Sequence, residues 1–145
     1  MSRAVLVDAG ALIALLDRDD AKHDRAVEAL KEIRDPLVTV WPALTEAMHL
    51  LADTHLGPET LCDMVFDQAV TMADLSAPDM ARVKALMQKY RDVPMDFADA
   101  ALVCVAEREQ LTTMLTFDRH FTVYRLPRRV AFTVLPKPRT RAVLK

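Results

Sequence analysis

Four acidic residues lie where predicted strands end or predicted helices begin. They are Asp8, Glu46, Asp99 and Asp118. In an open parallel sheet the carboxyl ends of the strands share one edge, and ligand sites form along that edge. We therefore expect these carboxylates to meet in one pocket although they are far apart in the sequence. Two unit charges ~4 Å apart repel each other by roughly 4 kcal/mol at an effective dielectric near 20, so such a pocket calls for a cation.

The type of ligand indicates which cation is expected and what it would do. Hard oxygen ligands without a cysteine or histidine set favour Mg²⁺, with Mn²⁺ as the second choice, over zinc. Such an ion orients a phosphate and stabilises charge on the attacking and leaving oxygens, with water as the nucleophile. The sequence thus predicts a metal-dependent site that cleaves phosphodiester bonds.

Each acid also has a purely structural explanation. Asp8 can cap the helix that follows it, and Glu46 can interact favourably with the dipole of its own helix. Asp96 and Asp99 share one face of a first helical turn, where Asp96 is the better candidate for a cap. Asp118 can begin a turn. Their common position relative to the sheet favours one shared site over four separate structural roles.

Short apolar runs that alternate with helical patterns predict the elements that hold these acids. We expect strands at residues 4–7, 37–40, 70–75, 113–116 and 130–135, with the last of them at a sheet edge. Six helices are expected between and around them, the last over residues 96–110. This alternation predicts an α/β fold of three layers, in which a central parallel sheet of four or five strands lies between helices.

Composition indicates one soluble domain. The chain has 145 residues, of which 52% are hydrophobic, and we assign residues 1–135 to the domain and 136–145 to a basic tail. Cys62 and Cys104 lie in apolar helical patterns and are expected to be buried thiols in a reducing cytoplasm. No apolar run is long enough to span a membrane. Trp41 is expected to pack against the core, with stacking on a nucleobase as the alternative.

Positive charge is concentrated at the end of the chain, although the net charge is −2. No acidic residue follows Asp118, whereas eight lysines and arginines do. Such a segment can gather the phosphates of a polyanion or can simply keep a tail in solution, and both interpretations stay open. The residues expected to bind nucleic acid are Arg119, Arg139 and Arg141. His120 is the histidine closest in sequence to one of the acids.

Four stretches of the chain together resemble the PIN-domain family, and within it the VapC-type toxins of bacterial type II toxin–antitoxin pairs. The stretches are residues 7–17, 41–47, 94–103 and 115–119. None is specific alone, but their order and spacing are. The resemblance implies an acidic quartet with Mg²⁺ held directly by two of its members, and two auxiliary residues. The quartet is Asp8, Glu46, Asp99 and Asp118, the metal ligands are Asp8 and Asp99, and the auxiliary residues are Asp96 and Thr116.

The resemblance also implies a function. It implies a ribonuclease that cleaves RNA, an antitoxin that blocks its site, and a homodimer. One departure is that Ala9 follows Asp8, where many members of the family carry a hydroxyl residue. The main alternative is an RNA-binding or partner-binding module with the same fold and little catalysis. A small phosphatase with an aspartyl nucleophile ranks lower, because the second Asp that it would need is replaced by Gly10.

Overall fold

The computed structural model describes residues 3–138, and within them the main sheet has five parallel strands. The strands are β1 (Val5–Val7), β2 (Leu37–Thr39), β3 (Val70–Met72), β4 (Thr113–Leu115) and β7 (Thr133–Leu135), in the order β3-β2-β1-β4-β7. β1 is central, since Leu6 pairs with Val38 on one side and with Met114 on the other. The predicted parallel sheet is confirmed, and the first strand of the chain lies in its middle.

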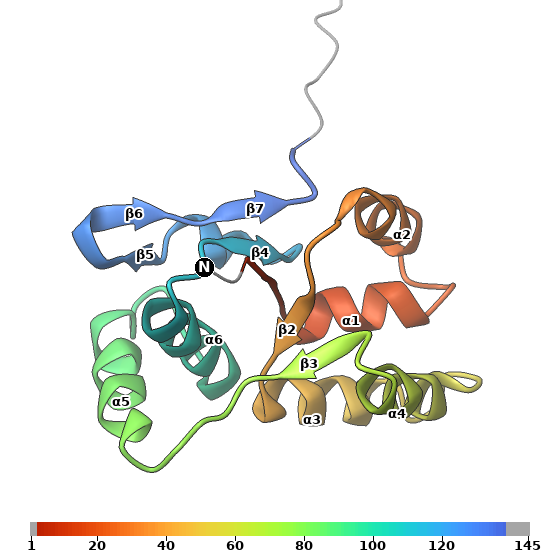
Figure 1. Cartoon of the computed structure of the whole chain (residues 1–145), viewed down its shortest axis with the longest axis horizontal. Helices are drawn as coiled ribbons and strands as arrows, with labels where there is room; N and C mark the ends of the chain where they lie inside the picture. The colour runs from red at the N-terminus through yellow and green to blue at the C-terminus, as the bar shows by residue number, and fades with distance from the viewer. Residues whose placement is uncertain (1–2, 139–145) are drawn as a thin grey trace, which may run out of the picture.

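The described residues contain six α-helices in two layers (Figure 1). α1 (Ala9–Leu16), α2 (His23–Glu32), α3 (Trp41–Leu50) and α4 (Gly57–Phe66) lie on one side of the sheet, and α5 (Asp79–Lys89) and α6 (Phe97–Glu109) on the other. This division follows from the chain path: it moves outward from β1 to β3 and then returns to β4, and right-handed crossovers in opposite directions place helices on opposite faces. The predicted three-layer architecture is confirmed.

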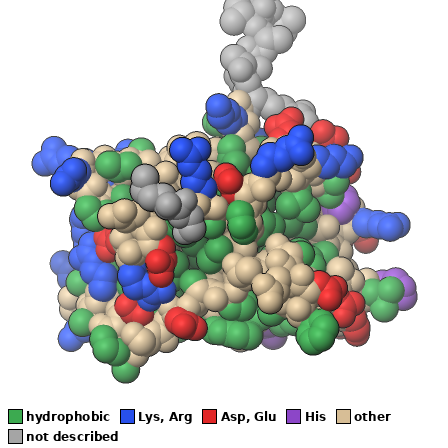
Figure 2. All heavy atoms as spheres, in the orientation of Figure 1, with side chains coloured by type: hydrophobic (Ala, Val, Ile, Leu, Met, Phe, Trp, Pro, Cys, Tyr) green, Lys and Arg blue, Asp and Glu red, His purple; other side chains and the backbone are tan. Residues whose placement is uncertain are grey.

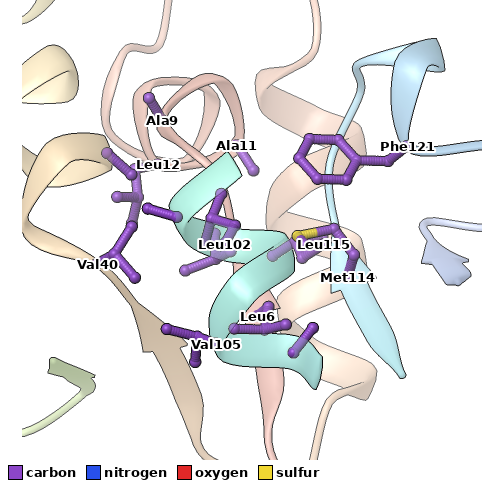
Figure 3. Packing of buried hydrophobic residues seen from close by; sticks show 14 of the residues in the cluster. Leu6, Ala9, Ala11, Leu12, Val40, Leu102, Val105, Met114, Leu115 and Phe121 are labelled. Carbon is purple, nitrogen blue, oxygen red and sulfur yellow. The ribbon is translucent and has the colours of Figure 1, made fainter. Parts of the chain in front are cut away.

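Helix α6 forms the most deeply buried part of the helical layers. All residues from Ala100 to Ala106 are buried, so the helix is apolar on every side, as expected of an internal helix. Leu102 and Val105 pack among Leu6 of β1 and residues of β4 (Figure 3). The position of the first turn of α6 is therefore fixed relative to the carboxyl ends of β1 and β4.

The prediction of one strand over residues 130–135 is wrong in part. Only β7 joins the main sheet, at its edge as predicted, whereas β6 (Val130–Ala131) pairs antiparallel with β5 (Arg125–Leu126) in a separate small sheet. Between β5 and β6 lies the 3₁₀ turn η2 (Pro127–Arg129). Phe132 separates β6 from β7 because its ring is buried and packs 6.0 Å from that of Phe121.

Two predictions about individual side chains are also wrong. Trp41 is 54% exposed, because it lies off the buried stripe of α3, and Cys62 is exposed because it lies one position, about 100° of helix, from the buried Leu61. Cys104 is buried as predicted. Across residues 3–138, no helix has the length and apolar character to cross a membrane.

Candidate active site

Carboxylates from separate segments of the chain line a pocket of about 390 Å³ at the carboxyl ends of the central strands. The acidic residues among its described lining are Asp8, Asp20, Glu46, Asp96, Asp99 and Asp118. The structure thus brings the four predicted acids together and adds the predicted auxiliary Asp96. Asp20, in the loop between α1 and α2, was not predicted, because it follows neither a strand nor a helix start in the sequence.

Asp8 is the most buried of these acids, with 6% of its surface exposed. It follows β1 directly and caps α1, since its Oδ1 accepts a hydrogen bond from the Ala11 N–H at 2.9 Å. Its Oδ2 accepts a hydrogen bond from the Thr116 hydroxyl. Burial raises the pKa of Asp8 to about 6 against the opposing effect of these two hydrogen bonds, and repulsion from Asp118 and Glu46 adds to the rise. The capping role and the site role therefore coexist.

Thr116 connects two of the acids. Its hydroxyl donates to Asp8 and accepts a hydrogen bond from the Asp118 N–H at 2.9 Å. The side chain is buried beyond the end of β4. Because β1 and β4 are neighbours in the sheet, this bridge fixes the segment after β4 against the end of β1.

Asp96 and Asp99 form a capping box at the start of α6. Asp96 Oδ1 accepts from the Asp99 N–H at 2.8 Å, and Asp99 Oδ2 accepts from the Asp96 N–H at 3.4 Å. Burial, followed by the charge of Asp96, raises the pKa of Asp99 to about 7, and Asp118 adds to the effect. Asp96 is the cap that the sequence indicated, and it also brings a second charge beside Asp99.

Glu46 reaches the pocket from α3. It is exposed on that helix, off the buried stripe. Contact between α3 and α6 places it near the capping box. The pKa of Glu46 is raised, first by partial burial and then by repulsion from Asp96 and Asp118. Among residues 3–138, no donor forms a hydrogen bond with its carboxylate.

Asp118 begins a chain of side-chain contacts that leads away from the pocket. Its Oδ1 accepts a hydrogen bond from the His120 N–H at 2.9 Å and lies 2.8 Å from His120 Nδ1. The His120 ring stacks on the buried Tyr124 ring, with 6.4 Å between the two ring centres. Tyr124 donates its hydroxyl to the Pro94 carbonyl at 2.7 Å, and burial together with the charges of Asp99 and Asp118 raises its pKa. Tyr124 was missed because it lies in a stretch without a helix or strand pattern.

The predicted nucleic-acid-binding residues are less closely associated with the pocket. Arg119 is exposed next to Asp118 and does not line the cavity. Arg139 and Arg141 lie outside the residues that the structure describes. Lys22 is the single basic residue among the described lining of the pocket, and no pattern in the sequence indicated its position.

The fit of the pocket to a divalent ion depends on how many protein ligands the ion needs. In the described part of the chain, no three His, Cys, Asp or Glu side chains form a ready-made ligand set for one ion. Mg²⁺ does not require such a set, since it usually keeps several waters and is held by one or two carboxylates. Asp8 and Asp99 offer hard oxygen ligands, and their raised pKa values reflect burial and repulsion that a cation would offset. The donor set therefore fits Mg²⁺ or Mn²⁺.

A family model and a curated protein that match this chain agree with each other. The family model described as the PIN domain matches residues 5–126. A curated protein from Mycobacterium tuberculosis, ribonuclease VapC26, is 29% identical over 136 residues, which cover 91% of this chain and 100% of that protein.

Solved structures share the fold at lower sequence identity. The structure of Mycobacterium tuberculosis VapC20, a toxin that cleaves the sarcin-ricin loop, covers 82% of this chain and 93% of its own, with a TM-score of 0.76 and 18% identity. The match to a toxin–antitoxin complex from Klebsiella pneumoniae covers 79% of this chain and 87% of the matched chain, with a TM-score of 0.62 and 20% identity. The match to VapBC2 from Rickettsia felis, bound to a DNA fragment from its promoter, covers 90% of this chain and 98% of the matched chain, with a TM-score of 0.65 and 14% identity.

Proposed function

Because the chain belongs to the PIN-domain family, we propose that it is a Mg²⁺-dependent endoribonuclease and acts as the toxin of a toxin–antitoxin pair. The observation that carries the proposal is the convergence of the predicted acids, from four segments of the chain, on one pocket. The similarity to a protein named as a ribonuclease supports RNA as the substrate. The similarity to a toxin–antitoxin complex supports an antitoxin as the partner.

The proposed roles follow from the position of each side chain. Asp8 and Asp99 are the direct ligands of Mg²⁺, or of Mn²⁺, because Asp8 is buried, Asp99 is partly buried, and both are repelled by the other acids of the pocket. When bound, the ion supplies Lewis-acid polarisation of the scissile phosphate and promotes ionisation of the attacking water. Thr116 keeps Asp8 in one orientation through its hydroxyl, and Asp96 does the same for Asp99 through the capping box.

Glu46 and Asp118 complete the proposed catalytic set. The Glu46 carboxylate has a raised pKa and accepts no hydrogen bond from residues 3–138, so it is available to take the proton of the attacking water. Asp118 is held by the backbone of His120 and adds a further carboxylate to the lining of the pocket. Hydrolysis needs no covalent protein nucleophile in this scheme.

The proposed function also assigns domain boundaries and partners to the chain. Residues 1–135 form the catalytic domain, and residues 136–145 form a basic tail in which Arg139 and Arg141 contact RNA phosphates together with Arg119. The protein acts in the cytoplasm as a homodimer until an antitoxin segment covers the acid pocket. RNA binding by the tail would weaken as salt is raised, because phosphate contacts release counterions.

The test is cleavage of a mixed cellular RNA pool by purified protein that is free of antitoxin. We expect discrete fragments with Mg²⁺ or Mn²⁺, none with EDTA, and none from Asp99→Asn. Asp63→Asn is a matched control, because Asp63 is an exposed residue of α4 outside the pocket. Folded protein that binds the metal and RNA but leaves RNA intact would instead support the alternative, a binding module with the same fold.

A further inference from the structure

Lys22 has an unusual position for a basic residue, because it lines a pocket whose other charged groups are all acidic among the described residues. Its backbone is fixed on both sides. The Lys22 N–H donates to Asp20 Oδ1 at 2.8 Å, and the Lys22 carbonyl accepts from the Ala26 N–H at 2.9 Å in the first turn of α2. The lysine therefore projects from a defined point at the start of the helix.

The side chain of Lys22 lies against Phe117. Its Nζ is 6.0 Å from the centre of the Phe117 ring, and the Cζ of Arg25 is 5.5 Å from the same centre. These distances are in the range of cation–π contacts. Phe117 lines the pocket and directly precedes Asp118. Lys22 thus lies at the rim of the acid site, and Arg25, which lines the neighbouring cavity, adjoins that rim through the Phe117 ring.

Both cations are available to a ligand. Within residues 3–138, neither Lys22 nor Arg25 takes part in an ion pair, whereas Arg82 and Arg108 do. An aromatic ring orients a cation without neutralising its charge. An anion that approaches the acid pocket would therefore meet Lys22 at its edge, with Arg25 beside it on the Phe117 ring.

RNA needs such groups because the pocket itself repels phosphate. The chain carries a net charge of −2, and the face in Figure 2 shows basic and acidic side chains interleaved around a hydrophobic middle. This face supplies no broad positive field to hold a polyanion. Cations close to the pocket are therefore suited to hold a phosphate next to the scissile one.

We propose that Lys22 and Arg25, oriented by Phe117, form a clamp for an RNA phosphate that flanks the scissile one. This assignment rests on the proposed ribonuclease function and specifies how that site holds its substrate. Lys22 and Arg25 contact the substrate directly, and Phe117 is a positioning residue. The clamp fixes the register of the strand, so that one phosphodiester bond lies among the acids.

The experiment measures binding and cleavage of a labelled single-stranded RNA by the full chain. Binding is followed by fluorescence anisotropy in EDTA at KCl concentrations from about 50 to about 200 mM, a range over which phosphate binding weakens strongly, and cleavage is followed with Mg²⁺. The variants are Lys22→Ala/Arg25→Ala and the charge-conserving Lys22→Arg/Arg25→Lys. The matched control is Lys31→Ala/Lys89→Ala, which removes the same charge from exposed positions outside the pocket, with Lys89 also over an aromatic ring.

The clamp predicts that the double alanine variant binds RNA about tenfold more weakly. The slope of log affinity against log salt concentration should become shallower by about 0.7 for each phosphate that the variant no longer neutralises. Its KM should rise while its kcat stays within about twofold of the wild-type value. The charge-conserving variant should recover most of the binding.

Two negative results are distinguishable. If wild-type protein binds and cleaves RNA and the double alanine variant matches the Lys31→Ala/Lys89→Ala control in affinity and salt slope, the clamp is wrong and the ribonuclease proposal stands. If wild-type protein neither binds nor cleaves RNA, the proposed function fails and the clamp fails with it.

Discussion

The two ends of the α5–α6 helix pair carry carboxylates in opposite surroundings. At one end, Glu107 receives two hydrogen bonds from the Arg82 guanidinium at 2.6 and 2.7 Å, and Asp79 lies 2.7 Å from an Arg108 nitrogen. At the other end, Asp96 and Asp99 face each other and the acids of the pocket.

The pKa values of the two groups shift in opposite directions. A backbone hydrogen bond from Ser76, aided by Arg108, lowers the pKa of Asp79, whereas burial and the charge of Asp96 raise that of Asp99 to about 7. The charged form of a carboxyl group is thus stabilised at one end of the helix pair, and at the other end it is destabilised by burial and by neighbouring negative charges. Perturbed carboxylates that converge in a pocket indicate function, and paired ones indicate structure.

The largest difference between the two ends should come from one substitution made at both. Asp99→Asn should lower RNA cleavage by at least about 100-fold, more than the loss of a residue that only supports a metal ligand. Asp79→Asn should leave cleavage within about twofold of the wild-type rate, because Asp79 lies outside the pocket, and should lower only stability. Initial rates of cleavage and urea unfolding of both variants check this. Equal losses of activity would remove the distinction between the two ends.

The opposite pKa shifts predict how stability depends on pH without metal. The folded protein binds a proton at Asp8 more tightly than the unfolded chain, with a pKa of about 6 against 3.8. The free energy of unfolding should therefore fall by about 2 kcal/mol from this residue as pH rises from about 4 to about 8. Asp99 should lower the free energy of unfolding further as pH rises through its pKa of about 7.

Urea unfolding in EDTA at about pH 5 and about pH 8, on either side of the raised pKa values, measures this pH dependence. Asp99→Asn should flatten the profile, because the asparagine no longer titrates. Asp79 acts with the opposite sign: its lowered pKa gives stability at neutral pH that is lost on acidification. A stability of wild-type protein that rises steadily across this range would contradict the assigned repulsion in the pocket.

Thr116→Val separates the hydroxyl bridge from the acids that it joins. The substitution keeps the shape of the side chain but removes the hydroxyl that connects Asp8 to the Asp118 backbone. Cleavage should fall about 10–100-fold, as for other residues that orient metal ligands. Thr116→Ser retains the hydroxyl and should keep most of the activity. A valine variant with the wild-type rate and metal affinity would show that the bridge is not needed.

The smallest expected effect belongs to the paired end. Arg82→Ala should lower the free energy of unfolding by at most about 1 kcal/mol, because the guanidinium is half exposed and exposed pairs contribute little. Cleavage should not change. Thermal or urea unfolding measures the loss, and raised salt should reduce it. A loss of activity would mean that the two ends of the helix pair are coupled.

Much of the fold was predictable because its signals are local. Three buried apolar residues followed by an acid and a helical pattern identify β1, Asp8 and α1, and the parallel sheet then determines that acids at strand ends converge. The capping box was half predicted, since Asp96 was recognised as a cap but its reciprocal bond with Asp99 was not.

Contacts that depend on loop conformation were not predictable. The stacking of His120 on Tyr124 follows from a 3₁₀ turn, η1 (Arg119–Thr122), that has no periodic pattern. The place of Lys22 depends on a hydrogen bond to Asp20 within a charged loop. The break at Phe132 depends on the distant Phe121, with which it packs. The first two are local loop conformations without a periodic sequence pattern, and the third is a tertiary contact; composition and spacing encode none of them.

The most direct test of the metal-site assignment is titration of the Asp99 side-chain carboxyl by ¹³C NMR, with and without Mg²⁺. Without metal, its pKa should be near 7. Saturating Mg²⁺ should lower this pKa by more than about one unit in wild-type protein, because a bound cation favours the carboxylate. The Asp79 carboxyl should not respond. An Asp99 pKa that Mg²⁺ leaves unchanged would contradict the assignment of Asp99 as a metal ligand.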